Sequence, residues 1–295
     1  MPYKPRILLV GLTRNSSAYI RDEFLFYISL FQSEELSGVF MIESDSTDST
    51  VQELQNLKTD FLGLFDFQSF GDLESSIPDR INRLRFCRNA YVNIIRTMAE
   101  NDAINLVIVA DMDRINKSIS RKALNLVFEE NTIQWDACFP NQSLLYYDLL
   151  ALRANNWLSV DFSELTERSV RIFVNMHNYK SKILRYLKKE YVRQKIFRRK
   201  MIHIPKSADW ISVKSAFGGF GIYKVEMFLD HDYGELRSGT KECEHVTFHR
   251  EASLSGKNLY ISPHLINHHF SLHTLRKSML LRISRRFLVN LGLLQ

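Results

Sequence analysis

Short apolar runs alternate with segments of helical periodicity through the first half of the chain. Between the first two runs, Ile20, Phe24 and Tyr27 recur at the three- and four-residue spacing of one helix face. The predicted strands are residues 6–13, 38–42, 61–67 and 106–110, and the longest predicted helix is residues 80–100. This alternation predicts an α/β fold with a mostly parallel, doubly wound sheet and helices on both faces.

The second half of the chain is less regular. Residues 135–140, WDACFP, and residues 259–262 are predicted as strands, and Pro263 stops the second of them. Residues 242–255 are predicted as a helix that ends at Gly256. We expect one domain at residues 1–270 with a basic helical insertion at about residues 163–205, followed by a C-terminal amphipathic helix at residues 271–295.

Composition changes this picture mainly through the location of the charge. The 295 residues are 45% hydrophobic and 24% charged, which is ordinary for a globular protein. Three widely spaced cysteines favour a reducing compartment and lack the spacing of a zinc site. The formal charge is +6, but residues 180–200 alone contribute +9, from ten Lys or Arg and one Glu. Because the basicity is local and no base-reading motif accompanies it, we expect no nucleic-acid partner.

The stretch NLVIVADMDRIN, residues 105–116, carries the most informative pair of acids. Asp111 and Asp113 follow a buried strand, at the end where ligands bind in open α/β sheets. Their carboxylates suit Mg²⁺ or Mn²⁺ bridging a diphosphate, with Asp113 as the first metal ligand and Asp111 on a ribose or a metal-bound water. His268 or His269 could complete the metal shell or lie in a surface loop. A strand followed by an Asp-rich turn would look the same, so the pair needs support from other motifs.

Four further side chains are candidate ligands for a nucleotide. Glu43 and Asp45 follow the second predicted strand and could contact the base and ribose, with helix capping as the alternative. Arg14 and Arg88 could bind the nucleotide and its diphosphate through bidentate contacts. For Arg88 the alternative is a solvated helix face.

Several stretches, taken in order, resemble nucleotide-sugar-dependent glycosyltransferases of the GT-A fold. They are GVFMIESDSTDST, LRFCRNA, IVADMD, SAFGGFGIYK and ECEHVTFHREASLSGKNLYISPHLINHH. The resemblance covers roughly residues 6–270 and is closer to fungal capsule-associated α-1,3-mannosyltransferases and their bacterial relatives, through YYDLLALR, SAFGGFGIYK and ECEHVTFH. It implies that Gly218 and Gly219 lie on the acceptor side, where glycine lets the backbone approach a ligand closely.

The resemblance also points to a catalytic acid. In the large inverting family 2 of these enzymes, the acid-bearing helix begins Glu-Asp, whereas this chain has Glu244 followed by His245. The resemblance implies Glu244 as the catalytic base, with Glu242 as its rival. A helix N-terminus favours an acid in any case. Because the fungal relatives retain configuration and the Glu244 helix resembles an inverting family, the stereochemical outcome stays open.

The function implied by the resemblance is sugar transfer. The expected donor is a nucleotide sugar, with GDP-mannose favoured, and the acceptor is a glycan or glycolipid in surface polysaccharide synthesis. The implied cofactor is Mn²⁺ or Mg²⁺, which neutralises charge on the leaving diphosphate. The alternative is a catalytically silent binding protein on the same fold that acts through its basic helices. The intact Asp111, Asp113 and Glu244 argue against this alternative.

The last segment, residues 271–295, predicts a contact with a membrane surface. Leu272, Leu275 and Met279 recur at helical spacing among basic residues, and no acid follows Glu251. This is the pattern of an interfacial helix with a basic face, although a helix packed on the domain is the alternative. Since the chain lacks a membrane-length apolar run and a signal-peptide pattern, we expect a cytoplasmic protein, with the inner face of the membrane as its place of contact.

Overall fold

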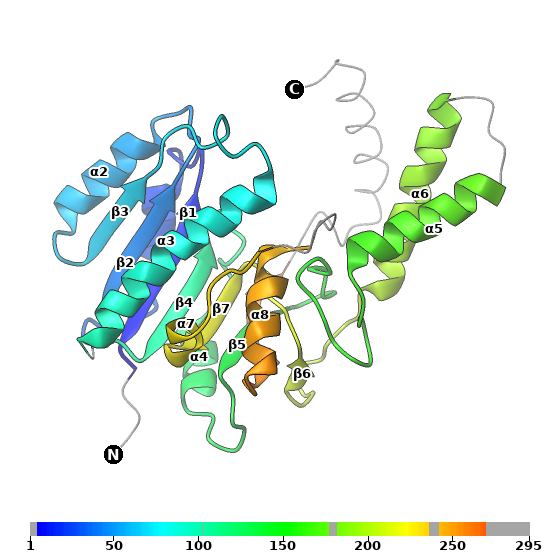
Figure 1. The fold of residues 1–295 in the computed structure, drawn as a ribbon. Coiled ribbons are helices and arrows are strands. Elements are labelled where there is room, and N and C mark those ends of the chain that lie inside the picture. Colours follow the sequence, from blue (N-terminus) through cyan, green and yellow to red (C-terminus); the bar gives the residue numbers. More distant parts are fainter. Residues whose placement is uncertain (1–4, 102, 177–181, 236–241, 270–295) are drawn as a thin grey trace.

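The structure is a computed structural model that describes residues 5–101, 103–176, 182–235 and 242–269. Within these residues, the strands are β1 (Ile7–Thr13), β2 (Leu36–Glu43), β3 (Phe65–Ser69), β4 (Leu106–Asp111), β5 (Ala137–Gln142), β6 (Ile211–Val213), β7 (Phe220–Lys224) and β8 (Leu259–His268). They form one sheet in the order β3-β2-β1-β4-β7-β5-β8-β6 (Figure 1). Four of the seven strand pairings are parallel, which confirms the predicted mostly parallel α/β sheet.

Helices cover both faces of this sheet, as predicted. Along β1, Ile7 packs with one hydrophobic cluster and its neighbour Leu8 with the other, because successive strand residues point to opposite faces. One cluster includes α1 (Ile20–Ser29), α2 (Thr50–Asp60) and α4 (Arg121–Phe128). The other includes α3 (Arg80–Glu100), α7 (Glu226–Leu229) and α8 (Glu244–Leu254). The two buried clusters hold the central strands rigidly between them.

Two further helices, α5 (Phe162–Met176) and α6 (Lys182–Lys200), pack on each other and project beyond the sheet (Figure 1). At the base of the pair, the ring centroids of Phe162 and Phe197 lie 5.5 Å apart, and Trp157 Nε1 donates to the Lys200 carbonyl at 2.6 Å. Among the helices in the described part of the chain, none is long and apolar enough to cross a membrane. The predicted helix at residues 271–295 lies outside the described residues.

Some predicted boundaries were wrong, and Pro263 gives the clearest physical reason. β8 does not stop at Pro263 but continues to His268. The register of β8 against β5 slips at this point, from Ser262 opposite Pro140 to Ile266 opposite Asn141. Proline is accepted in a strand at such an irregularity because its missing N–H is not needed there. Similarly, β3 and β5 begin four and two residues later than predicted, and α8 begins at Glu244 rather than at residue 242.

The parallel central strands bring their carboxyl ends to one edge of the sheet. In the pairing register, Thr13 of β1 lies opposite Glu43 of β2, and Leu12 lies opposite Asp111 of β4. The strand order reverses between β1 and β4. The strands β2 and β3 lie on one side of β1, and β4 lies on its other side. Ligand crevices in open α/β sheets form at such a reversal, outside the carboxyl ends of the strands.

Candidate active site

A cavity of about 560 Å³ opens at this edge, and we call it the first cavity. It is bounded by the end of β4, one face of α3, the loop before β7 and the first residues of α8. The predicted site residues that line it are Arg14, Asp45, Arg88, Asp111, Asp113, Gly218, Gly219 and Glu244. Segments distant in sequence therefore converge on one site.

Arg88 connects the elements that form this cavity. Its Nε lies 2.8 Å from Oε1 of Glu244, and its Nη2 lies 3.5 Å from Oδ1 of Asp111. A third donor, Nη1, lies 3.2 Å from the Tyr91 hydroxyl. Since the residue is only 3% exposed, its charge depends on these partners and not on water. Arg88 therefore belongs to the site and does not lie on a solvated helix face.

Among the residues of α3 that line the first cavity, only Arg88 was predicted from the sequence. The lining residues from this helix are Arg80, Arg83, Leu84, Cys87 and Arg88, at the spacing of a single helix face. Arg83 lies 3.6 Å from the Asp45 carboxylate and 3.1 Å from that of Glu74, which also pairs with Arg14 at 3.2 Å. The periodicity of the arginines would have revealed this basic wall.

Asp111 and Asp113 are held in an environment that disfavours their charged forms. Loss of solvent raises the pKa of Asp111 to about 6, although 38% of its side chain is exposed to the open cavity. Arg88 lowers that pKa, whereas Asp113 raises it. The pKa of Asp113 is also raised, mainly by loss of solvent. Two neighbouring carboxylates of this kind favour the binding of a cation, because its positive charge stabilises the ionised form of both.

The metal-binding potential of the site rests on these two carboxylates. In the part of the chain that the structure describes, no group of three or more His, Cys, Asp or Glu side chains is placed to hold a metal ion. The donor set nevertheless fits Mg²⁺ or Mn²⁺, which are commonly bound by one or two carboxylates together with substrate phosphates. Asp111 and Asp113 would therefore hold a cation together with a bound diphosphate.

Gly218 and Gly219 are required by the local packing. Both have a positive φ, +68° and +91°, which L side chains rarely adopt. A Cβ at Gly218 would lie 2.7 Å from Gln142 Nε2, and a Cβ at Gly219 would lie 2.7 Å from Ile115 Cγ2. The carbonyl of Gly219 accepts from Asp111 N at 2.9 Å, so this loop fixes the end of β4.

Two lining residues acquire their importance only in the structure. Asp148 accepts a hydrogen bond from Gly218 N at 2.7 Å, and burial raises the pKa of its carboxyl. His245 stacks on Phe217 with ring centroids 3.7 Å apart, and neither ring nitrogen has a hydrogen-bond partner among the described residues. Burial, followed by the charge of Arg88, lowers the pKa of His245 and keeps the imidazole neutral. The motif YYD gave a weak signal for Asp148, and the sequence marked His245 only as a departure from the Glu-Asp start of the family helix.

Four predicted site residues lie outside the first cavity. Glu43 accepts from Ser46 N at 3.0 Å and from the Ser69 hydroxyl, so its carboxylate holds the loop after β2. Glu242 pairs with Arg250 at 2.7 Å and lines a different cavity. His268 ends β8 and His269 follows it; the carbonyls of both accept from Ser143, and the His268 side chain lowers the pKa of Asp113.

No protein-family model and no curated protein matches the chain. Among solved structures, it is similar to the mannosyltransferase PcManGT from Pyrobaculum calidifontis in complex with GDP-Man and Mn²⁺, at 12% identity over 88% of this chain and 57% of that one, with a TM-score of 0.43. It is also similar to residues 1–349 of TarS from S. aureus, at 14% identity over 96% of this chain and 65% of that one, with a TM-score of 0.44.

A third match is the same TarS fragment in complex with UDP-GlcNAc, at 13% identity over 87% of this chain and 55% of that one, with a TM-score of 0.41. The chain thus spans less than two thirds of the length of each of these structures. With TM-scores below 0.5, these likenesses carry no argument about the activity of this chain.

Proposed function

We propose that this protein is a glycosyltransferase of the GT-A type, which moves a sugar from a nucleoside diphosphate donor to an acceptor hydroxyl. The observation that supports this most directly is the convergence of Arg88, Asp111, Asp113 and Glu244 on one cavity at the carboxyl ends of the parallel strands. Such a cavity combines a basic wall for phosphates, paired carboxylates for a cation and a further buried carboxylate for proton transfer.

In the proposed reaction, the bond between the anomeric carbon and the diphosphate oxygen breaks, and its electron pair leaves with the diphosphate. An acceptor oxygen forms the new bond to that carbon, and its proton passes to a carboxylate. A divalent cation held by Asp111 and Asp113 would neutralise charge on the departing diphosphate. Arg80, exposed on the same wall, supplies positive charge for the phosphates, whereas Arg83 is already paired with Asp45 and Glu74.

Glu244 is the preferred proton acceptor. Its Oε1 is paired with Arg88, while the hydrogen-bond partner of its Oε2 among the described residues is the Cys243 thiol, at 3.5 Å. The rival within the same cavity is Asp148, since Glu242 lies outside it. Glu244→Gln should lower transfer by on the order of 10² to 10⁴ and preserve donor binding. Glu251→Gln, at an exposed position of the same helix outside both lining sets, is the matched control. A near wild-type rate for Glu244→Gln would transfer the role to Asp148.

A donor panel tests the activity itself. GDP-, UDP- and dTDP-sugars are incubated with the protein and Mn²⁺, and the released nucleotide is measured with and without saccharide acceptors. We propose GDP-mannose as the preferred donor and a glycan or glycolipid of surface polysaccharide synthesis as the acceptor, on the basis of the sequence resemblance. Absence of nucleotide release from every donor would overturn the enzymatic assignment in favour of a silent binding protein.

We also propose that the protein contacts the inner face of a membrane through basic helices. The sequence of α6 contains nine Lys or Arg and one Glu, and residues 271–295 supply a second basic segment. Each cation near an anionic leaflet contributes on the order of 1 kcal/mol. Flotation with phosphatidylserine vesicles should show binding that weakens with salt and falls on removal of residues 271–295. A protein that stays off these vesicles at low salt would contradict the proposal.

A further inference from the structure

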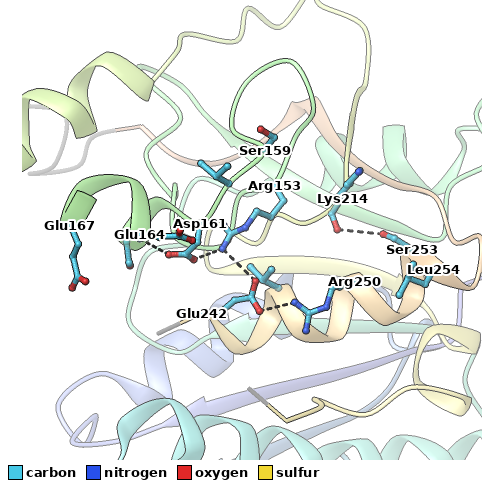
Figure 2. A pocket seen from close by; sticks show the side chains of 13 residues that line it. Arg153, Ser159, Asp161, Glu164, Glu167, Lys214, Glu242, Arg250, Ser253 and Leu254 are labelled. Carbon is cyan, nitrogen blue, oxygen red and sulfur yellow. Dashed lines mark hydrogen bonds and ion pairs between the residues drawn. The ribbon is translucent and has the colours of Figure 1, made fainter. Parts of the chain in front are cut away.

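A second cavity, of about 700 Å³, lies beside the first, and α8 forms part of both. Figure 2 shows the side chains that line the second cavity. Glu244 and His245, at the start of α8, line the first cavity. The α8 residues that line the second cavity are Val246, Arg250, Ser253 and Leu254, whose spacing of four, three and one places them on one helix face. The helix that carries the candidate base therefore forms a wall of both cavities.

The two cavities adjoin along two segments of chain. Glu242 lines the second cavity and Glu244 the first, two residues later. In the same way, Leu150 and Ala151 line the first cavity and Arg153 the second. Since two residues of extended chain span at most about 7 Å, a ligand in the second cavity is close enough to present one of its groups to the first.

The floor of the second cavity is a network of paired charges. Figure 2 shows Arg153 between Asp161 and Glu242; its guanidinium pairs with Asp161 and lies 3.8 Å from Glu242. On the far side of Glu242, Arg250 Nη1 lies 2.7 Å from the carboxylate. Arg153 Nη1 also donates to the Leu152 carbonyl at 2.8 Å. Because these charges satisfy one another, the floor is preorganised and has little net charge to offer a ligand.

Three other charged side chains line the cavity without an ion-pair partner among the described residues. They are Glu164 and Glu167, both exposed on α5, and Lys214, which follows β6. Among the described lining residues, carboxylates without an ion-pair partner thus outnumber such ammonium groups by two to one. Two apolar side chains are also exposed at this cavity, Val160 at 50% and Leu254 at 78%.

These observations define a ligand chemistry. Carboxylates accept hydrogen bonds from hydroxyls and ammonium groups, and they repel anions. Exposed aliphatic groups next to them suit the C–H face of a sugar ring, because a ligand there removes apolar surface from water. A ligand with many hydroxyls and no negative charge satisfies both features.

We propose that the second cavity binds the acceptor, and that the acceptor is a neutral or amine-bearing saccharide and not an anionic one. This inference rests on the proposed glycosyl transfer. The sugar ring lies against Val160 and Leu254, and Glu164 and Glu167 accept from its hydroxyls or its ammonium group. The reactive hydroxyl passes the turn between Glu242 and Glu244 and enters the first cavity.

Direct binding provides the test, because it needs no donor. A methyl hexoside, a methyl hexosaminide with a free amine and a methyl hexuronide are titrated into the full chain and followed by NMR. Wild-type protein should bind the first two at least about tenfold more tightly than the hexuronide. Glu164→Lys with Glu167→Lys should shift this ratio by about tenfold toward the hexuronide. Glu34→Lys with Glu100→Lys, at two exposed positions outside both cavities, should leave it unchanged.

The results separate this inference from the proposed function. Any one of three results overturns the acceptor assignment, even if donor turnover is intact. The first is a preference of wild-type protein for the hexuronide, and the second is a lack of binding to all three glycosides. The third is an unchanged ratio in the Glu164→Lys, Glu167→Lys protein. Absence of nucleotide release from every donor overturns the proposed function.

Discussion

Nε of Arg88 lies 2.8 Å from Oε1 of Glu244, and this ion pair joins α3 to α8 at the wall of the first cavity. The two side chains are only 4% and 5% exposed. Burial of both ions carries a large desolvation cost, which is offset only while each charge has its partner. The pair therefore holds the candidate base in place and couples it, through the other side of the guanidinium, to Asp111.

Replacement of Arg88 by Met should lower the free energy of unfolding by about 3–5 kcal/mol, because it leaves the Glu244 carboxylate buried without its partner. Urea unfolding followed by circular dichroism measures the change. Arg14→Met is the matched control: Arg14 pairs with Glu74 at an exposed position, and its loss should cost less than about 1 kcal/mol. Adding Glu244→Gln to Arg88→Met should recover part of the loss. A cost below about 1 kcal/mol for Arg88→Met would show that the pair is not structurally important.

Asp113→Asn should abolish metal-dependent donor turnover and leave the fold intact. One of two carboxylates is lost, and a hard-cation site with so few protein ligands depends on each of them. Titration of Mn²⁺ in the presence of GDP, followed by electron paramagnetic resonance, should show weaker binding than in wild type. Asp60→Asn, on the far end of α2, is the control. Full activity in Asp113→Asn, with Mn²⁺ still required, would remove Asp113 from the metal site.

The parts of the fold that the sequence predicted are those set by local periodicity. The residues of β1 before Thr13 and of β4 before Asp111 carry no polar side chain, because both faces of these strands are covered, so the sequence identified them as strands. The continuation of β8 past Pro263 was not readable, because it depends on a register slip against β5, a strand more than a hundred residues away. The antiparallel insertion of β7 between β4 and β5 likewise depends on long-range pairing.

In the candidate site, too, the features set by local sequence were predicted and those set by tertiary contacts were not. Asp111 and Asp113 could be located because strand ends meet at one edge of a sheet, whatever the rest of the chain does. Glu242 and Glu244 could not be separated, since only the orientation of α8 turns one toward Arg250 and the other toward Arg88. His245 needed the structure most, because burial against Phe217 is a tertiary contact.

His245→Phe should raise the free energy of unfolding by about 1 kcal/mol and lower glycosyl transfer. The stabilisation is expected because both ring nitrogens are buried without a hydrogen bond among the described residues, and removal of an unsatisfied polar group recovers part of its desolvation cost. Phe retains the stacking on Phe217. Chemical denaturation and the transfer assay give the two readouts. A destabilised variant would show that the imidazole has a polar partner, and unchanged transfer would exclude its contact with substrate.

Glu23 holds the turn that follows Asp113. Its carboxylate oxygens accept from the backbone N–H of Arg114, both at 3.0 Å, and Arg114 has a φ of +68°. Glu23 is 3% exposed, and this burial raises its pKa from 4.5 to about 7. The negative charge of Asp113 raises it further. Between pH 4.5 and 7 the folded state therefore retains a proton that the unfolded chain releases.

Because the folded state binds more protons in that window, the contribution of Glu23 to stability is complete below pH 4.5 and is lost as the pH rises to about 7. The loss is at most about 3 kcal/mol, because the pKa of Glu23 rises from 4.5 to about 7 on folding. The lowered pKa values of His245 and His249 act in the opposite direction, so the total curve does not isolate Glu23. The difference between wild type and Glu23→Gln does isolate it. Unfolding free energies measured from pH 4.5 to 8 should fall in wild type relative to Glu23→Gln, and parallel curves would show that Glu23 titrates normally.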